Sequence, residues 1–330
     1  MNDISNRKAL EPLEALLADD AVTEIMVDAP DRVIVERKGK LEDAGVKFES
    51  PEALRAAIDA TLALGGATLQ PGQTVAHTRL SDGSRILAVL PPTAVNAGPY
   101  LVIRKVWKTT LTMNQLLEWG VITPEARALL QSAILAPRNF LVTGGTGSGK
   151  TTLLNLLVDE IPADQRVVAV EPVFELHLRH PRAINLSADR APDISFSDLV
   201  VTGSWMRPDW LIVGELLGSE ALQVLQIMSR GHSGMTTMHA TSVEDALSRL
   251  EAMCLMANMG LGLGDIRTLI ASAIHVITHQ EKMRDGSRRV MQIAELRGVE
   301  NDRYVLQPLM RYNPDTGKLE ATGSLPGWES

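Results

Sequence analysis

Short apolar runs separated by turn residues fill the first third of the chain. Apolar residues at helical spacing over 10–17 predict a helix. Ser50 followed by Pro51 predicts the start of a second helix, which ends near Leu64. Apolar runs bounded by turn residues predict strands at 24–27, 33–36, 74–80, 85–90 and 100–104. Together these elements predict a small α+β domain over residues 1–107.

The pattern changes in the remainder of the chain. Residues 108–112 have no strong periodicity and are predicted to be a linker. Thr123 predicts the cap of a helix that ends near Leu135, and strands and helices then alternate, which predicts a parallel sheet with helices on its faces. The predicted strands are 140–142, 167–170, 211–213, 235–238 and 275–278. Residues 113–330 are therefore predicted to form an α/β domain.

Composition and charge limit the functions to consider. The 330 residues, 45% hydrophobic and 22% charged, suit a soluble protein of two domains. A net charge of −8 argues against nucleic acid as the main partner. The single cysteine, Cys254, excludes an internal disulfide and a tetracysteine zinc site, and its apolar neighbours predict a buried, unreactive thiol. No uncharged apolar run approaches the roughly 20 residues of a membrane span, so membrane association is expected only through a partner.

Residues 144–151 read GGTGSGKT and fit the phosphate-loop pattern G-x-x-x-x-G-K-[ST] between an apolar strand and a helix. Glycines let the loop turn its N–H groups toward one anion, and the helix N-terminus adds positive charge. Lys150 is predicted to reach the β- and γ-phosphates of ATP, and Thr151 to bind Mg²⁺. The predicted ligand-binding residues here are Gly144, Gly145, Thr146, Gly147, Ser148, Gly149, Lys150, Thr151 and Thr152.

Acidic residues follow two of the predicted strands. Glu215 ends the run RPDWLIVGE, where an acid in a phosphate-loop protein lies beside Mg²⁺ and the attacking water. Glu171 and Glu175 follow the strand 167–170, and ligands of open parallel sheets bind beyond the carboxyl ends of the strands. The alternative for Glu171 and Glu175 is a solvated loop carrying ordinary acids.

Two histidines and three arginines complete the set of candidates. His232 and His239 flank a predicted strand, and a neutral imidazole can hydrogen-bond a phosphate oxygen. Zinc is a weak alternative without a nearby cysteine, and structural histidines are another. Arg79, Arg85 and Arg104 lie on or beside strands of the first domain, where exposed edge charge is the ordinary explanation.

The motifs taken together resemble the secretion and pilus-assembly ATPases of the VirB11/PulE superfamily. The resemblance is greatest to the CpaF/TadA-type branch of tight-adherence and type IV pilus systems, followed by conjugation ATPases of the TrbB type. It runs nearly from end to end of the chain. The stretches that carry it are VTEIMVDAPDRVIVERKGKLE, DGSRILAVLPP, LVIRK, GGTGSGKTTLLN, EPVFEL, MRPDWLIVGE, GHSGMTTMHA, DALSRLEAM and DGSRRVMQIAEL.

The resemblance implies a fold and roles for particular residues. It implies a RecA-like ATPase domain with Lys150 and Thr151 as Walker A residues and Glu215 as the Walker B-like acid, beside Mg²⁺. Glu175 matches the catalytic glutamate of the acidic box. Two further pairs match residues of this family. They are His232 and His239 in the histidine box, and Arg85 and Arg104, which reach the nucleotide phosphates from the N-terminal domain.

The sequence departs from the pattern of this family at three places. Pro172 replaces the aspartate of the acidic box, and Trp205 and Leu217 stand where arginines are usual. These losses predict weaker hydrolysis or an altered arginine set, for which Arg230 is a candidate replacement.

The resemblance therefore predicts a homohexameric ATPase at the cytoplasmic face of the inner membrane. It would drive a platform protein in that membrane by ATP-dependent motion of its two domains. The alternatives are a nucleotide-binding scaffold with weak hydrolysis, a conjugative-transfer ATPase, and a RecA-like nucleic-acid motor, against which the negative charge argues.

Overall fold

The computed structural model describes residues 2–37, 39–95, 98–105, 111–190 and 193–328. The chain divides into two compact units, 1–110 and 111–330. The predicted linker at 108–112 falls largely on 106–110, outside the described residues, and residues 111 and 112 belong to the second unit. Each unit is therefore described by itself.

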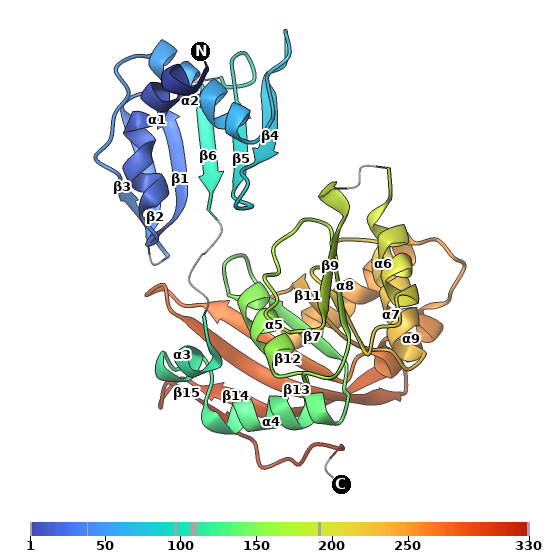
Figure 1. Ribbon diagram of the computed structural model, residues 1–330. Coiled ribbons are helices and arrows are strands. Elements are labelled where there is room, and N and C mark those ends of the chain that lie inside the picture. The colour runs from blue at the N-terminus through green and yellow to red at the C-terminus, as the bar shows by residue number, and fades with distance from the viewer. Residues whose placement is uncertain (1, 38, 96–97, 106–110, 191–192, 329–330) are drawn as a thin grey trace. The chain divides into compact units, whose positions relative to one another are not determined.

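The first unit is a six-stranded antiparallel sheet covered by two helices (Figure 1). The strand order is β3-β2-β1-β6-β5-β4. Buried aliphatic side chains of both helices and the sheet form one core, which includes Leu13, Ile58 and Ile103. The elements are α1 (Asn2–Ala18), β1 (Val22–Ala29), β2 (Arg32–Arg37), β3 (Lys40–Asp43), α2 (Pro51–Leu64), β4 (Val75–Arg79), β5 (Arg85–Val89) and β6 (Tyr100–Arg104).

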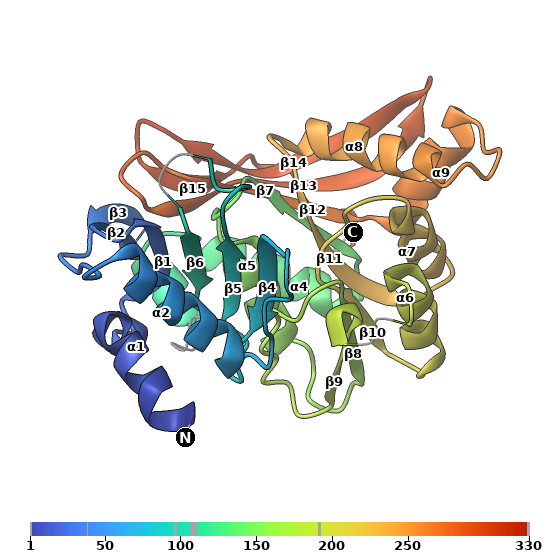
Figure 2. The ribbon, with the colours of Figure 1, turned by 90° about the horizontal axis from the view of Figure 1, so that it is seen from above.

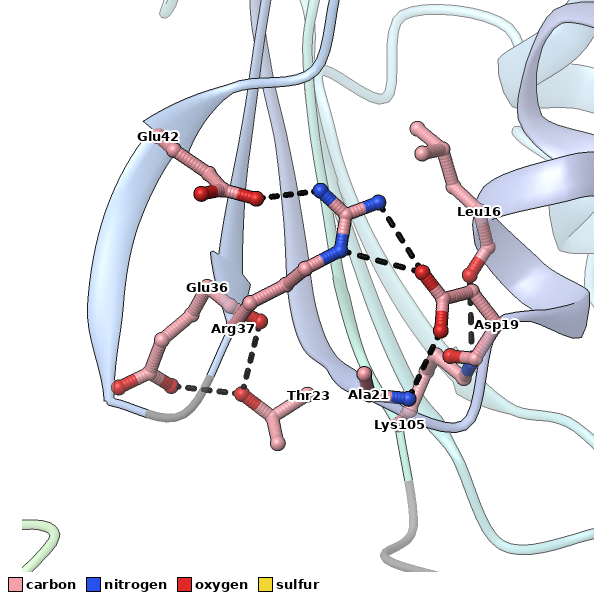
Figure 3. Close-up of polar contacts among 8 residues, drawn as sticks. All are labelled: Leu16, Asp19, Ala21, Thr23, Glu36, Arg37, Glu42 and Lys105. Atoms are coloured by element: carbon pink, nitrogen blue, oxygen red, sulfur yellow. Dashed lines mark hydrogen bonds and ion pairs between the residues drawn. The ribbon is translucent and has the colours of Figure 1, made fainter.

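Polar contacts join the end of α1 to the ends of the strands β2 and β6 (Figure 3). The Arg37 guanidinium lies between two acids: Nε and Nη2 are 3.1 Å and 3.0 Å from Oδ2 of Asp19, and Nη1 bonds Glu42. The hydrogen bond from Ala21 N–H, and then Arg37, holds the pKa of Asp19 below its usual value. Lys105 Nζ donates to the carbonyl oxygens of Leu16 at 3.2 Å and Asp19 at 2.7 Å. A lysine ammonium thus satisfies carbonyl groups at the C-terminal end of α1, where cations are favoured.

We expect Lys105→Ala to loosen the last turn of α1. Hydrogen bonds from a charged group contribute about 1.5–3 kcal/mol each, so losing two should raise local amide exchange at least about tenfold. Hydrogen exchange of the full chain, read on peptides that cover residues 13–20, tests this. Lys47→Ala, at an exposed lysine, is the control. Equal amide exchange rates in Lys105→Ala and Lys47→Ala would contradict an anchoring role of Lys105.

The second unit is built on a nine-stranded mixed sheet in the order β15-β14-β13-β12-β7-β11-β10-β8-β9. The strands from β12 to β9 are parallel to their neighbours, and β13, β14 and β15 extend the sheet as antiparallel strands. The strands are β7 (Phe140–Gly144), β8 (Val167–Glu171), β9 (Ala183–Ser187), β10 (Trp210–Val213), β11 (Ser233–His239), β12 (Val276–Lys282), β13 (Arg288–Glu300), β14 (Arg303–Asn313) and β15 (Lys318–Ala321).

Helices cover both faces of this sheet (Figures 1 and 2). Along β7 the side chains alternate: Phe140 and Val142 join the core formed with α3, α4 and α5, and Leu141 joins the core formed with α6 to α9. Cys254 is buried in the second core, as predicted, and burial raises the pKa of its thiol to about 11. The helices are α3 (Met113–Glu118), α4 (Pro124–Leu135), α5 (Lys150–Asp159), α6 (Phe196–Trp205), α7 (Glu220–Ser229), α8 (Val243–Met256) and α9 (Leu263–Ala273), with a 3₁₀ turn at Ala188–Arg190.

The α/β class with a parallel sheet is confirmed for the centre of the second unit, but the sheet is larger than predicted. The antiparallel strands β13 to β15 and the edge strand β9 were not predicted. In the first unit, the strand β3, which begins at Lys40, was not predicted either. Its four residues are all exposed, so they bury no apolar face that the sequence pattern could reveal.

Candidate nucleotide site

The glycine-rich segment forms a loop between β7 and α5. Gly147 and Gly149 have positive φ angles of 71° and 97°, a region that glycine enters at little cost. Gly149 is the N-cap of α5, and within the described part of the chain no side chain caps the first N–H groups of that helix. These N–H groups are therefore directed to the site where a phosphate would bind.

The first glycine of the motif is required by packing. Gly144 pairs with Gln280 of the neighbouring strand β12, and a Cβ at Gly144 would lie 2.3 Å from the carbonyl oxygen of Gln280. Ser148 fills the remaining space, because its Oγ would lie 2.5 Å from the same Cβ. The loop thus packs closely against β12.

The side chains of Lys150, His239 and Glu215 form a connected row. Lys150 Nζ donates to the carbonyl oxygen of Gly145 at 3.1 Å and lies 3.3 Å from Nδ1 of His239. His239 Nε2 lies 3.1 Å from Oε1 of Glu215. A neutral His239 with its proton on Nε2 can accept from the lysine and donate to the glutamate. The structure therefore brings together the predicted Walker A lysine, the second histidine and the Walker B-like acid.

The position of these three residues follows from the sheet. The strands β7, β11 and β10 are neighbours and parallel, so their carboxyl ends meet at one edge. His239 is the last residue of β11, and Glu215 comes two residues after the end of β10. Thr237 Oγ1 donates to Gly214 O at 2.7 Å and fixes the chain before Glu215.

Lys150 is only 7% exposed. Burial lowers the pKa of its ammonium group, and the nearby charge of Glu215 opposes that change. A buried cation of this kind gains most from a second anion, such as a phosphate, that replaces its lost hydration.

Glu171 and Glu175 have different surroundings. Glu171 is 1% exposed at the end of β8, and its Oε2 accepts hydrogen bonds at 2.8 Å from the N–H groups of both Glu175 and Leu176. Its carboxylate therefore shapes the loop that carries Glu175. The Glu175 side chain itself is exposed.

Two other candidate residues lie at the amino ends of the strands, away from the phosphate loop. His232 and Arg230 precede β11, whereas His239 ends it. Seven strand residues span about 20 Å, so within the chain neither side chain reaches Lys150. The structure gives no support to the suggestion that Arg230 replaces a missing arginine beside the phosphate loop of the same chain.

The departures from the motif pattern include two exposed apolar side chains. Trp205 at the end of α6 is 80% exposed and Leu217 is 57% exposed. Pro172 follows Glu171, and its carbonyl oxygen accepts from Asp189 N–H at 3.1 Å. This hydrogen bond ties the loop after β8 to the 3₁₀ turn Ala188–Arg190.

Arg85 and Arg104 belong to the first unit, where they are directly paired across β5 and β6. Arg79 is paired with Arg85 across β4 and β5. Three arginines therefore lie in one row across neighbouring strands. The role of Arg85 and Arg104 at the nucleotide stays a prediction.

Comparison with known proteins places the chain in a family. The family model described as "Type II/IV secretion system protein" matches residues 6–309. The chain belongs to this type II/IV secretion family. Its branch within the family, predicted as CpaF/TadA-type, stays a prediction.

Relatives of this secretion-family chain cover nearly its whole length. A putative conjugal transfer protein of Mycobacterium tuberculosis is 33% identical over 325 residues, which cover 95% of this chain and 91% of that protein. The type IV secretion system protein VirB11 of Brucella suis is 30% identical over 314 residues, 85% of this chain and 87% of that protein. The crystal structure of the Legionella pneumophila ATPase DotB matches with a TM-score of 0.62 at 19% identity over 88% of this chain and 80% of that one, and this likeness supports the RecA-like fold.

No described helix of this secretion-family chain has both the length and the apolar character that a membrane crossing needs. The finding agrees with the absence of a long apolar run in the sequence.

Beneath the phosphate loop, the secretion-family chain buries a histidine that the sequence did not single out. His279 on β12 is 4% exposed, and its Nδ1 lies 3.0 Å from Oγ1 of Thr143 on β7. Burial lowers the pKa of His279, although the charges of Glu281, Glu244 and Asp245 oppose that change. Burial also lowers the pKa of His275 at the start of the same segment.

We therefore expect the secretion-family chain to lose stability as the pH falls below about 6.5. The unfolded chain binds protons at these two histidines there, and the folded chain does not until the pH reaches its lower folded pKa values. Urea midpoints at pH 7.5 and 5.5 measure the loss, which His279→Gln should reduce. The control is His177→Gln, at an exposed histidine. A His279→Gln protein whose stability depends on pH as in the wild type would contradict the assignment to His279.

Proposed function

We propose that this chain is an ATP-hydrolysing motor of a secretion or pilus-assembly machine. The row of Lys150, His239 and Glu215 beside an uncapped helix N-terminus is the observation that carries the proposal. A cation, a polar relay and an acid next to a phosphate-binding loop are the groups that phosphoryl transfer to water requires.

In the proposed reaction, N–H groups of residues 145–152 bind the β- and γ-phosphates. Lys150 exchanges its contacts with Gly145 O and His239 for phosphate oxygens, where its charge stabilises the transition state. Glu215, released from His239 or still bonded to it, orients the attacking water. Glu171 keeps Glu175 nearby as a second candidate for that task.

The residues present fit Mg²⁺. Magnesium is held through one or two protein oxygens together with phosphates and water. The hydroxyl of Thr151 in the first turn of α5 and the carboxylate of Glu215 are oxygen donors at the edge of the sheet where the loop lies. When bound, the ion would neutralise charge on the phosphates.

We further propose that the chain works as a homohexamer at the cytoplasmic face of the inner membrane. A platform protein in that membrane is the proposed partner, and no direct contact with nucleic acid is proposed. The ATP cycle would change the arrangement of the two units. Support comes from the family and from relatives named for conjugal transfer and type IV secretion.

Conjugative transfer is the second candidate system. Relatives named for conjugal transfer in Mycobacterium tuberculosis and Rhizobium radiobacter favour it. A pull-down that identifies the membrane partner separates a conjugation machine from a pilus machine.

We expect Lys150→Ala to reduce ATP hydrolysis to less than about a tenth of the wild-type rate. The loss of one charge-assisted contact to phosphate corresponds to at least ~1.4 kcal/mol. Steady-state phosphate release from purified protein measures it. Lys318→Ala on β15 is the matched control and should hydrolyse ATP normally. A wild-type chain that binds ATP but releases no phosphate would instead indicate a nucleotide-gated scaffold.

We expect Glu215→Gln to bind ATP with Mg²⁺ and to turn it over at least about tenfold more slowly, because the amide keeps the shape and loses the charge. Parallel measurements on Glu175→Gln decide between the two acids. An active Glu215→Gln protein together with an inactive Glu175→Gln protein would transfer the catalytic role to Glu175.

A further inference from the structure

The tip of the phosphate loop rests against the hairpin formed by β12 and β13. Arg288, the first residue of β13, donates from Nε to the carbonyl oxygen of Gly147 at 3.2 Å. A Cβ at Gly149 would lie 3.8 Å from Cγ of Arg288, and one at Gly147 would lie 3.9 Å from Cδ of Lys282. The arginine stem therefore packs along the loop, and its head group bonds the tip.

The carbonyl groups of the loop show why this contact matters. An anion-binding loop works only if its N–H groups face the ligand and its carbonyl oxygens point away. The carbonyl oxygen of Gly145 accepts from Lys150 Nζ and from Ser148 N–H, and that of Gly149 accepts from Leu153 N–H within the helix. The carbonyl oxygen of Gly147 accepts from Arg288, which lies outside the loop.

Gly147, as a glycine, has little conformational preference of its own. Its φ of 71° is reached easily by glycine, but glycine also adopts many other angles with little cost. Local sterics therefore do not fix the peptide between Gly147 and Ser148. Arg288 is itself held, because Nη1 donates to Gly286 O in the hairpin turn at 3.3 Å.

We propose that Arg288 is a positioning residue of the nucleotide site, which holds the Gly147 carbonyl outward so that the loop stays shaped for phosphate. This inference rests on the proposed function, since it takes a nucleoside di- or triphosphate as the ligand. Arg288 acts through the loop backbone and has no assigned contact with the nucleotide.

Arg289 provides a natural comparison. Successive strand residues point to opposite faces, and Arg289 Nη1 donates to Trp119 O, at the end of α3, at 3.0 Å. The two arginines are adjacent, have the same chemistry and belong to one strand, but only Arg288 bonds the phosphate loop.

Binding of a fluorescent ADP analogue to the full chain tests the proposal. We expect Arg288→Ala to raise Kd at least about tenfold and Arg289→Ala to change it less than about threefold. For ATP hydrolysis, Arg288→Ala should raise KM with kcat within about threefold of wild type, as lost ground-state binding predicts. Equal defects in the two alanine variants, or wild-type binding by Arg288→Ala, would overturn the proposal.

Two more variants separate positioning from charge. Arg288→Gln keeps a hydrogen-bond donor without the charge and should bind ADP at least about threefold more tightly than Arg288→Ala. Arg288→Lys keeps both and should bind more tightly still. If Arg288→Gln binds as weakly as Arg288→Ala while Arg288→Lys binds like wild type, Arg288 acts by charge alone and the positioning role is wrong.

Hydrogen exchange without nucleotide distinguishes this inference from the proposed function. Ser148 N–H donates to Gly145 O inside the loop. In Arg288→Ala, the amide hydrogens of peptides covering residues 144–150 should therefore exchange at least about tenfold faster than in wild type or Arg289→Ala. Faster exchange in a chain that binds no ADP would keep the positioning role and refute the proposed ligand. Unchanged exchange would refute the positioning role even if the chain binds ADP. Circular dichroism checks that each variant is folded.

Discussion

The buried ammonium group of Lys150 is the constraint on which the rest of the site depends. A cation that has lost most of its water must find partners, and the chain supplies a carbonyl oxygen, an imidazole nitrogen and, through His239, a carboxylate. These partners come from three segments far apart in the sequence. The site can therefore form only when β7, β10 and β11 are correctly paired, which couples the folding of the sheet to the assembly of the site.

Asn139 shows how this pairing is secured at the other edge of the sheet. Just before β7, its side chain accepts from Gly234 N–H at 2.8 Å and donates to Ala273 O at 2.6 Å. One buried amide thus links the start of β7 to β11 and to the end of α9. The strands are held at their amino ends by this network, while their carboxyl ends carry the residues of the proposed site. Stability and the proposed chemistry thus lie at opposite ends of the strands of one sheet.

The sequence predicted the central parallel strands and the phosphate loop because both depend on local patterns: apolar runs, and glycines at fixed spacing beside a helix. It also placed Glu215 and His239 at the carboxyl ends of buried strands, where the structure has them, and their role at a nucleotide stays a prediction. His232 was also named as a site residue, although the predicted parallel sheet already put His232 at the amino end of its strand and His239 at the carboxyl end, where the loop lies. Arg288 and His279 were missed because their importance comes from the place of the β12–β13 hairpin beside β7 and the phosphate loop, which is a tertiary property. Which acid would activate water in the proposed reaction is not fixed by pattern either, because Glu175 and Glu215 both follow strands that end at the same side of the sheet.

Cys254 makes this chain suited to site-specific labelling. Its thiol is buried and its raised pKa keeps it protonated near neutral pH, so maleimide reagents should leave it unmodified in the folded protein. Cysteines introduced on exposed residues of the two units would then be the sites that carry spin labels or dyes. Distances between such probes could be followed with and without added nucleotide before any native residue is replaced, and a label appearing at Cys254 would itself report that the core around α8 has opened.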